Sequence, residues 1–244
     1  MLVLFTDFGL SGPYVGQMKS VLHKFAPQIP VFDLMHDAPV FNPFASAHLL
    51  AAYRHSFADN AVFLSIVDPG VGSNRRAIVV RADQQYFVGP DNGLFYQLRF
   101  HSKDIEAWEV SYQPESLSTS FHGRDLFAPV AAMIASGDEV PGDKIASSSL
   151  LGFNQPRALA EVIYVDHYGN CITGLNADEM QTDDIVKVKD KQIAYARTFS
   201  ASPEKGLFWY INSSNMVEIA QNQGSAAHNL DIGVGKRVFK LKLP

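Results

Sequence analysis

The sequence has little cysteine, no basic run and no long apolar stretch, and each shortage removes a class of protein. Cys171 is the only cysteine among 244 residues, which excludes an intrachain disulfide and a multi-thiolate metal site and favours a reducing compartment. The formal net charge of -5 and the absence of a basic cluster argue against nucleic acid or an anionic membrane as partner. No apolar stretch approaches membrane-spanning length. Residues 1–7 lack a basic leader and are typical of a strand, so we expect a cytoplasmic protein.

The first half of the chain alternates buried strands with helices. A hydrophobic fraction of 47% with 18% charged residues is typical of a globular protein with one large core or two unequal domains. Apolar runs at residues 2–5, 31–35 and 62–67 predict strands, helical spacing from Val15 predicts the first intervening helix, and Asn42 before Pro43 predicts the start of the second. This order requires crossover connections, which predicts an α/β fold with a mostly parallel sheet sandwiched by helices. Apolar segments at 77–80 and 86–88 and a helix over about 125–136 extend the same unit.

The second half has a different pattern. A polar stretch from residue 142 to 150 is typical of a linker. Beyond it the helical period is lost, and short β-branched or aromatic segments alternate with turn residues, which predicts a smaller carboxy-terminal antiparallel β domain. The expected strands are residues 161–165, 171–175, 185–189, 192–199, 207–211, 216–220 and 237–243. We therefore expect two domains, 1–150 and 151–244.

Four polar side chains in the first domain occupy positions suited to chemistry. Asp7 and Asp68 follow buried strands, where open α/β sheets bind their ligands, although each could simply cap a loop or helix. Two glycines between Asp68 and Arg75 would let the loop double back and pair the two side chains, in a site or in a surface ion pair. His122 precedes an apolar helix, whose dipole favours a neutral imidazole able to accept a proton; a structural histidine at this junction is the alternative.

The β domain offers polar turns. Residues 166–170 present a carboxylate, a ring and an amide that suit an amino-acid or nucleoside ligand, and residues 212–214 and 222–226 supply further hydroxyl and amide groups. Ordinary turn chemistry explains each cluster equally well. The His-Glu-x-x-His spacing, the dinucleotide fingerprint and the phosphate loop are all absent, so we expect neither a metal nor a nucleotide cofactor.

Six ordered motifs together resemble the S-adenosylmethionine hydroxide adenosyltransferases, which are related to the fluorinases and chlorinases. They are Thr-Asp-Phe-Gly at 6–9 with Gly-Pro-Tyr-Val-Gly at 12–16, Asp-Pro-Gly-Val-Gly at 68–72 with Arg75 and Arg76, Gly-Pro-Asp-Asn-Gly at 89–93, Phe-His-Gly-Arg-Asp at 121–125, Asp-x-Tyr-Gly-Asn at 166–170, and Asn212-Ser213 with Glu-Ile-Ala at 218–220. The match runs along nearly the whole chain.

The resemblance implies a homotrimer in which a ligand lies between one subunit's first domain and a neighbour's second. It implies that Asp68, Arg75 and His122 are catalytic. It further implies that substrate contacts come from Asp7 at the ribose, Asp166 and Ser213 at the methionine end, Asn170 at adenine, and Tyr168, Phe199, Phe121, Glu218 and Gln223 around them. Asn215 stands where the family has glycine, and asparagine tolerates the left-handed backbone expected there.

The implied reaction is hydrolysis of S-adenosylmethionine to adenosine and methionine by in-line attack of water on the 5′ carbon, without a cofactor. Pairing with Arg75 would make Asp68 a weaker base, which favours His122 or a shared role and leaves the proton acceptor open. A halogenase-like activity is one alternative, but halogenases lack the Asp, Arg and His set, and fluorinases carry serine where this chain has Gly123. A non-catalytic nucleoside-binding module and a metal-dependent hydrolase are the others.

Overall fold

The computed structural model describes residues 1–242, which divide into a larger unit, Met1–Gln155, and a smaller unit that starts at Pro156. The division falls five residues beyond the expected boundary at 150, because the chain from 142 to 150, expected to be a linker, still belongs to the larger unit. It forms an edge strand there, and a polar edge strand lacks the apolar alternation that reveals a strand in a sequence.

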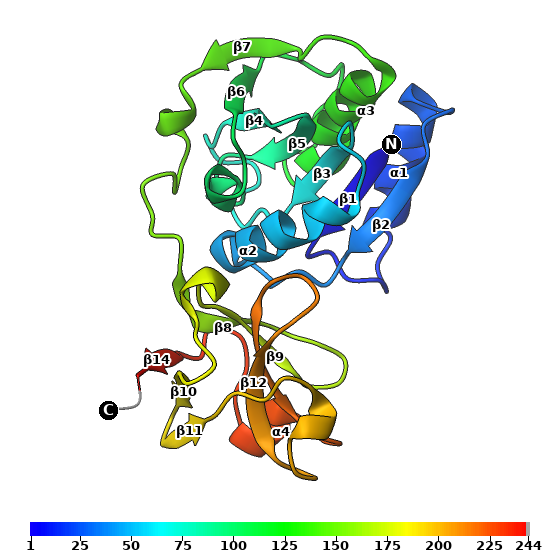
Figure 1. Cartoon of the computed structure of the whole chain (residues 1–244). Coiled ribbons are helices and arrows are strands. Elements are labelled where there is room, and N and C mark those ends of the chain that lie inside the picture. Colours follow the sequence, from blue (N-terminus) through cyan, green and yellow to red (C-terminus); the bar gives the residue numbers. More distant parts are fainter. Residues whose placement is uncertain (243–244) are drawn as a thin grey trace. The chain divides into compact units, whose positions relative to one another are not determined.

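The larger unit contains a seven-stranded sheet in the order β2-β1-β3-β5-β4-β6-β7 (Figure 1). Its strands are β1 (Leu2–Thr6), β2 (Val31–Met35), β3 (Val62–Ile66), β4 (Ala77–Ala82), β5 (Gln85–Pro90), β6 (Ile105–Val110) and β7 (Gly142–Ile145). Its helices are α1 (Tyr14–Phe25), α2 (Pro43–Tyr53) and α3 (Ala128–Ser136), with short helical turns η1 (Arg54–Ser56), η2 (Tyr96–Phe100), η3 (Gly123–Phe127) and η4 (Ser147–Ser149).

The predicted α/β fold is confirmed, and the sheet is mixed. Strands β2, β1, β3 and β5 pair in parallel, whereas β5, β4, β6 and β7 pair antiparallel. The change of direction arises because β4 and β5 form a hairpin with a two-residue connection whose first residue, Asp83, has a φ of 56°. A direct hairpin joins only antiparallel strands, so the crossover pattern ends at this point.

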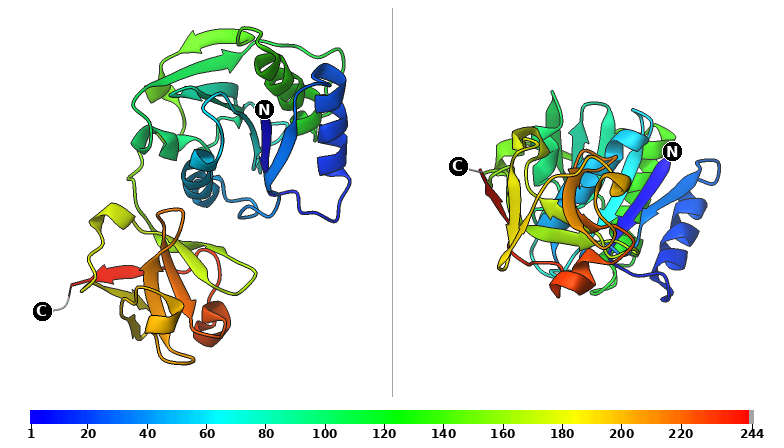
Figure 2. Two further views of the ribbon diagram at one scale, coloured as in Figure 1. Left: turned by 45° about the vertical axis from the view of Figure 1, so that its right-hand side comes forward. Right: turned by 60° about the horizontal axis from the view of Figure 1, so that its bottom comes forward.

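Helices pack on both faces of this sheet. Alternate residues of β1, Leu2 and Leu4, join the core beneath α1 and α3, which pack side by side (Figures 1 and 2). The intervening residues of β1 are also fully buried, as expected for a strand covered on both faces. The predicted opening of α2 is confirmed, because the Asn42 side chain accepts a hydrogen bond from the Ala45 N–H at 3.1 Å.

The smaller unit consists of two antiparallel sheets, ordered β12-β13-β9-β8 and β11-β10-β14. The strands are β8 (Leu159–Val165), β9 (Cys171–Gly174), β10 (Ile185–Val188), β11 (Lys191–Ile193), β12 (Leu207–Ile211), β13 (Val217–Gln221) and β14 (Phe239–Leu241). The helical elements are α4 (Ala226–Leu230) and the turns η5 (Ala177–Glu179) and η6 (Phe199–Ala201). The predicted β domain is confirmed, because each expected segment overlaps an observed strand; segment 192–199 was predicted too long, since it shares only residues 192 and 193 with β11. Its core is centred on Trp209, whose indole N–H donates to the Asp184 carbonyl at 3.0 Å. In residues 1–242 no helix has both the length and the apolar character needed to cross a membrane.

Candidate active site

The candidate active site is a pocket of about 650 Å³ within the larger unit, at the carboxyl ends of β1 and β3. The two strands are parallel neighbours in which Thr6 pairs with Ile66. Asp7 and Asp68 follow these strand ends, and both line the pocket. Parallel pairing therefore brings together two carboxylates that are 61 positions apart in the sequence, at the edge where open α/β sheets bind ligands.

Arg75 joins Asp68 to His122. The Arg75 Nε donates to both carboxylate oxygens of Asp68 at 2.9 Å, and its Nη2 also contacts Asp68 Oδ2. The same Nη2 donates to the Nδ1 of His122 at 3.1 Å. The side chains of Arg75 and Asp68 are only 9% and 5% exposed, and the guanidinium lies 5.1 Å from the centre of the Phe127 ring. The pair is thus buried and differs from a solvated surface ion pair; Asp68 lines the pocket, and Arg75 is not among the lining residues.

Glycine allows the loop between Asp68 and Arg75 to double back. Gly72 has a φ of 80°, and a Cβ atom on it would lie 2.5 Å from the carbonyl oxygen of Thr119. Only glycine, which has no Cβ, can adopt that backbone conformation at so close an approach. The contact presses the loop against the segment that leads into His122, which explains how residues 47 positions apart meet.

Burial and charge set the protonation of the pocket. Burial and the nearby Arg75 guanidinium lower the pKa of His122, against the opposing effects of Asp68 and Asp125. Burial raises the pKa of Asp7, an effect opposed by the hydrogen bond from the Phe41 N–H at 3.1 Å. Because arginine can only donate, the His122 Nδ1 must accept, and the neutral ring carries its proton on Nε2.

Aromatic rings form one wall of the pocket. Phe8, Tyr14 and Phe121 contact one another with ring centroids 5.4–5.9 Å apart. Phe121 is the only one of them expected to bind substrate, although Phe8 and Tyr14 lie within the quoted motifs. Phe41 also lines the pocket and was missed, because nothing in its local sequence indicates that it would lie beside Asp7.

In the smaller unit, the turn after β8 is organised by one carboxylate. Asp166 accepts hydrogen bonds from the backbone N–H groups of Tyr168 and Asn170 at 2.9 and 2.8 Å, and from the Asn170 side chain at 2.9 Å. The Oδ1 of Asn170 is buried and has no hydrogen-bond partner within residues 1–242. Tyr168 is 75% exposed. The turn therefore holds one buried acceptor that lacks a donor, and it exposes the ring of Tyr168, which contacts the His167 ring.

The other expected residues of the smaller unit differ in their exposure. Glu218 is 4% exposed, and its oxygens accept from the Tyr210 hydroxyl at 2.7 Å and the Asn212 amide at 2.8 Å. Asn212 in turn accepts from two backbone N–H groups of the turn that presents Ser213. Glu218 thus supports this turn from behind, whereas Ser213, Phe199 and Gln223 are exposed.

Asn215 lies in the same turn with a φ of 57°, so the left-handed backbone expected there is confirmed.

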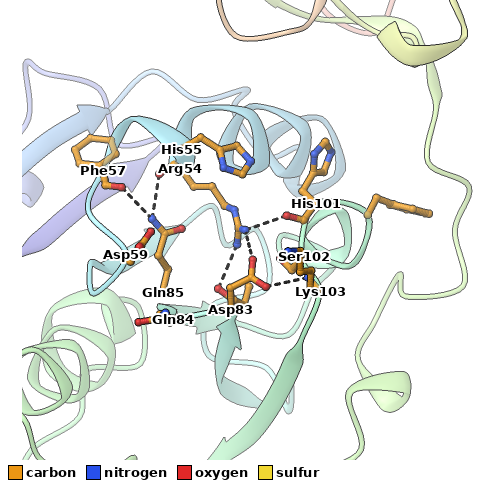
Figure 3. A pocket seen from close by; sticks show the side chains of 12 residues that line it. Arg54, His55, Phe57, Asp59, Asp83, Gln84, Gln85, His101, Ser102 and Lys103 are labelled. Atoms are coloured by element: carbon orange, nitrogen blue, oxygen red, sulfur yellow. Dashed lines mark hydrogen bonds and ion pairs between the residues drawn. The ribbon is translucent and has the colours of Figure 1, made fainter.

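A second pocket of about 710 Å³ lies at the β4–β5 hairpin of the larger unit (Figure 3). Its buried Arg54 donates to the Asp83 carboxylate at 2.8 Å and to the His101 carbonyl at 3.0 Å. The hairpin precedes β5, so this pocket lies at the amino end of a parallel strand. Ligands in open α/β sheets bind at the opposite end, which favours the Asp7 pocket as the functional one. In residues 1–242 no three His, Cys, Asp or Glu side chains form a group that could hold a metal ion.

The fold and the site define a two-unit α/β protein with a charged pocket at the carboxyl ends of its parallel strands. Family models for the amino- and carboxy-terminal domains of SAM hydroxide adenosyltransferases match residues 2–142 and 160–239. The chain belongs to the SAM hydroxide adenosyltransferase family, as the motifs predicted.

Full-length relatives agree with this assignment. The chain is 33% identical to an (R)-S-adenosyl-L-methionine hydrolase from Salinispora arenicola over 96% of this chain and 94% of that protein. An uncharacterized conserved protein from Thermotoga maritima has a similar structure, with a TM-score of 0.88 and 32% identity over 99% of this chain and 100% of that one. A fluorinase from Nocardia brasiliensis is only 22% identical, over 98% of this chain and 96% of that protein.

Proposed function

We propose that this protein hydrolyses S-adenosyl-L-methionine to adenosine and L-methionine by attack of water on the 5′ carbon. The observation that carries the proposal is the Asp68–Arg75–His122 group: Asp68 and His122 line the same pocket as Asp7, and the buried Arg75 joins them by hydrogen bonds. The hydrolases among the relatives support the substrate and the reaction.

The sulfonium of the substrate is already a good leaving group, so the enzyme must chiefly hold water in line with the carbon–sulfur bond. The water oxygen forms the new bond to the 5′ carbon, the carbon–sulfur bond breaks, and methionine leaves as a neutral thioether. One proton is released.

The hydrogen bonds favour a division of labour for this water. Arg75 occupies the His122 Nδ1, so the imidazole presents Nε2–H and donates to the water oxygen. Asp68 keeps unused lone pairs beside its bonds to Arg75 and accepts the water proton. This assigns proton acceptance to Asp68, with His122 orienting the water, whereas the sequence favoured His122 or a shared role.

Substrate contacts come from both units in this proposal. Asp7 accepts hydrogen bonds from the ribose hydroxyls, and Phe121 contributes apolar surface. The free Oδ1 of Asn170 suits the exocyclic amine of adenine, because it is a buried acceptor that lacks a donor. Tyr168 and Phe199 stack on the base, and Asp166 and Ser213 bind the methionine end. Gln223 adds a polar contact, and Glu218 acts through the turn that it supports.

Oxygen-18 labelling tests the reaction directly. Purified protein treated with a chelator is incubated with S-adenosylmethionine in oxygen-18 water. We expect methionine and adenosine labelled at the 5′ oxygen, because water attacks the 5′ carbon. We also expect activity to survive chelation, because we propose that no metal or other cofactor takes part. Loss of activity on chelation would indicate a metal-dependent hydrolase. Tight adenosine binding without methionine release would indicate a binding module. A 5′-halo product in the presence of added halide would indicate a halogenase.

The proposal includes a cytoplasmic homotrimer in which neighbouring subunits complete each site. Sedimentation equilibrium of the purified chain tests the trimer, and a monomer with full activity would contradict it.

A further inference from the structure

The loops that follow β1 and β2 are joined beside Asp7. The Gly9 N–H donates to the His36 carbonyl at 2.6 Å, and the Ala38 N–H donates to the Thr6 carbonyl at 3.1 Å. The Asp7 carboxylate itself accepts from the Phe41 N–H at 3.1 Å. The orientation of Asp7 therefore depends on how the loop after β2 is held.

A chain of side chains runs behind this junction. Lys19 Nζ contacts Asp33 Oδ2 at 2.6 Å, Asp33 Oδ1 contacts His36 Nε2 at 3.0 Å, and His36 Nδ1 contacts the Thr6 hydroxyl at 2.8 Å. The Phe8 N–H then donates to Thr6 Oγ1 at 3.3 Å. Thr6 and Phe8 are the two neighbours of Asp7, so the chain reaches the backbone on both sides of the carboxylate.

The hydrogen-bond direction at Asp33 is fixed. Burial acts to raise the pKa of Asp33, but the hydrogen bonds and charges of Lys19 and His36 outweigh burial and lower the pKa overall, so Asp33 is an anion that only accepts. His36 Nε2 therefore donates to Asp33. The Thr6 hydroxyl accepts from the Phe8 N–H and forms its second hydrogen bond with His36 Nδ1, in a direction set by the state of the imidazole. The chain is connected in either direction, as in carboxylate–histidine pairs that orient a third group.

The residue types Asp, His and Thr also form nucleophilic triads, but burial excludes that reading. Thr6 is 0% exposed and His36 is 4% exposed. Substrate has no access to the hydroxyl, so its effect must be exerted through neighbouring groups.

We propose that Thr6, His36 and Asp33 form a buried positioning relay that holds the Asp7 carboxylate ready for the ribose hydroxyls. The inference rests on the proposed function only in taking Asp7 as the ribose contact. Orienting the carboxylate before binding lowers the entropy lost when the nucleoside binds. The relay acts on affinity, since none of its members reaches the water-activating group.

Thr6→Val tests the relay because valine keeps the shape of threonine and removes only the hydroxyl. We expect adenosine to bind about tenfold more weakly, with a similar rise in KM and kcat within about twofold of the wild type. Thr6→Ser keeps the hydroxyl and should bind adenosine like the wild type. Calorimetry measures the affinity, and steady-state methionine release gives KM and kcat.

Ser65→Ala is the matched control. Ser65 lies on the neighbouring strand β3, is 0% exposed, and its hydroxyl has no partner within residues 1–242. Removing it should leave adenosine affinity unchanged. If Thr6→Val does not fold, Asp33→Asn replaces it, because the half-exposed Asp33 tolerates substitution and its amide no longer fixes the proton of His36.

The outcomes separate the relay from the reaction. Wild-type adenosine affinity in Thr6→Val or Asp33→Asn, with only a lowered melting temperature, would overturn the relay and leave the hydrolase intact. If the wild-type protein does not bind adenosine, both the assignment of Asp7 to the ribose and the relay are wrong.

Discussion

The two units build their polar sites in different ways. In the larger unit, the parallel pairing of β1 and β3 brings Asp7 beside Asp68, and the packing of Gly72 against Thr119 brings the Asp68–Arg75 loop to the segment that leads into His122. In the smaller unit, Asp166 bonds to residues two and four positions away, within one turn. The first arrangement gathers charged side chains from distant segments in one pocket, and the second organises a single turn around one carboxylate. We therefore expect the larger unit to control turnover and the smaller unit to control affinity.

Removing the acceptor in the larger unit should have the largest effect. We expect Asp68→Asn to reduce turnover by about 10² to 10⁴-fold, since the water loses its proton acceptor, with little change in adenosine affinity. Methionine release and calorimetry measure the two quantities. Asp83→Asn breaks an Arg–Asp pair at the opposite end of the sheet and should retain wild-type turnover. Wild-type turnover in Asp68→Asn would remove Asp68 from the reaction.

The pH profile sharpens the same contrast. Because burial and Arg75 lower the pKa of His122, we expect turnover to persist below the ordinary histidine pKa of about 6.5. Protonated His122 would face Arg75 as a second donor, so activity should fall as pH drops through the lowered pKa. In Arg75→Gln the cation is gone, so turnover should fall by roughly 10²-fold and the acid limb should move to higher pH. An unmoved limb would show that His122 is not the titrating group.

A smaller effect, on affinity alone, is expected in the other unit. Asn170→Ala should weaken adenosine binding by about tenfold, because the acceptor for the adenine amine is lost, with kcat changed less. Asn229→Ala, at an exposed position of α4, serves as control. A loss of kcat at saturating substrate, with affinity retained, would reverse the assignment of roles to the two units.

The last prediction concerns stability. Gly169 has a φ of 84°, and a Cβ there would lie 2.0 Å from the Ser225 Oγ that caps α4. Gly169→Ala should therefore destabilise the smaller unit by about 1–3 kcal/mol and lower its melting temperature. Gly233→Ala, where nothing lies within 4 Å, should melt like the wild type. Equal melting temperatures would mean that the turn adapts and is not held rigid.

The predictable parts of the fold were those with strong local signals. Asn42 before Pro43 predicted the start of α2, and β-branched and aromatic residues between turn signals predicted β12 and β13, because capping and strand propensity act over a few residues. The edge strand β7 was missed because it buries too little apolar surface, and Gly142 within it passes so close to β6 that a Cβ would lie 2.2 Å from the Glu109 carbonyl oxygen. The need for a residue without a Cβ at position 142 is visible only once β6 and β7 are paired.

The sequence by itself determined the residue types of the site, the turn that Asp166 organises and the family to which the chain belongs, since these depend on local spacing and ordered motifs. The tertiary structure decided which nitrogen of His122 faces Arg75, and it placed Thr6, His36 and Asp33 in one hydrogen-bonded chain behind Asp7. Hydrogen bonds depend on distance and direction to within fractions of an ångström, and only strand pairing and loop packing set these between distant residues.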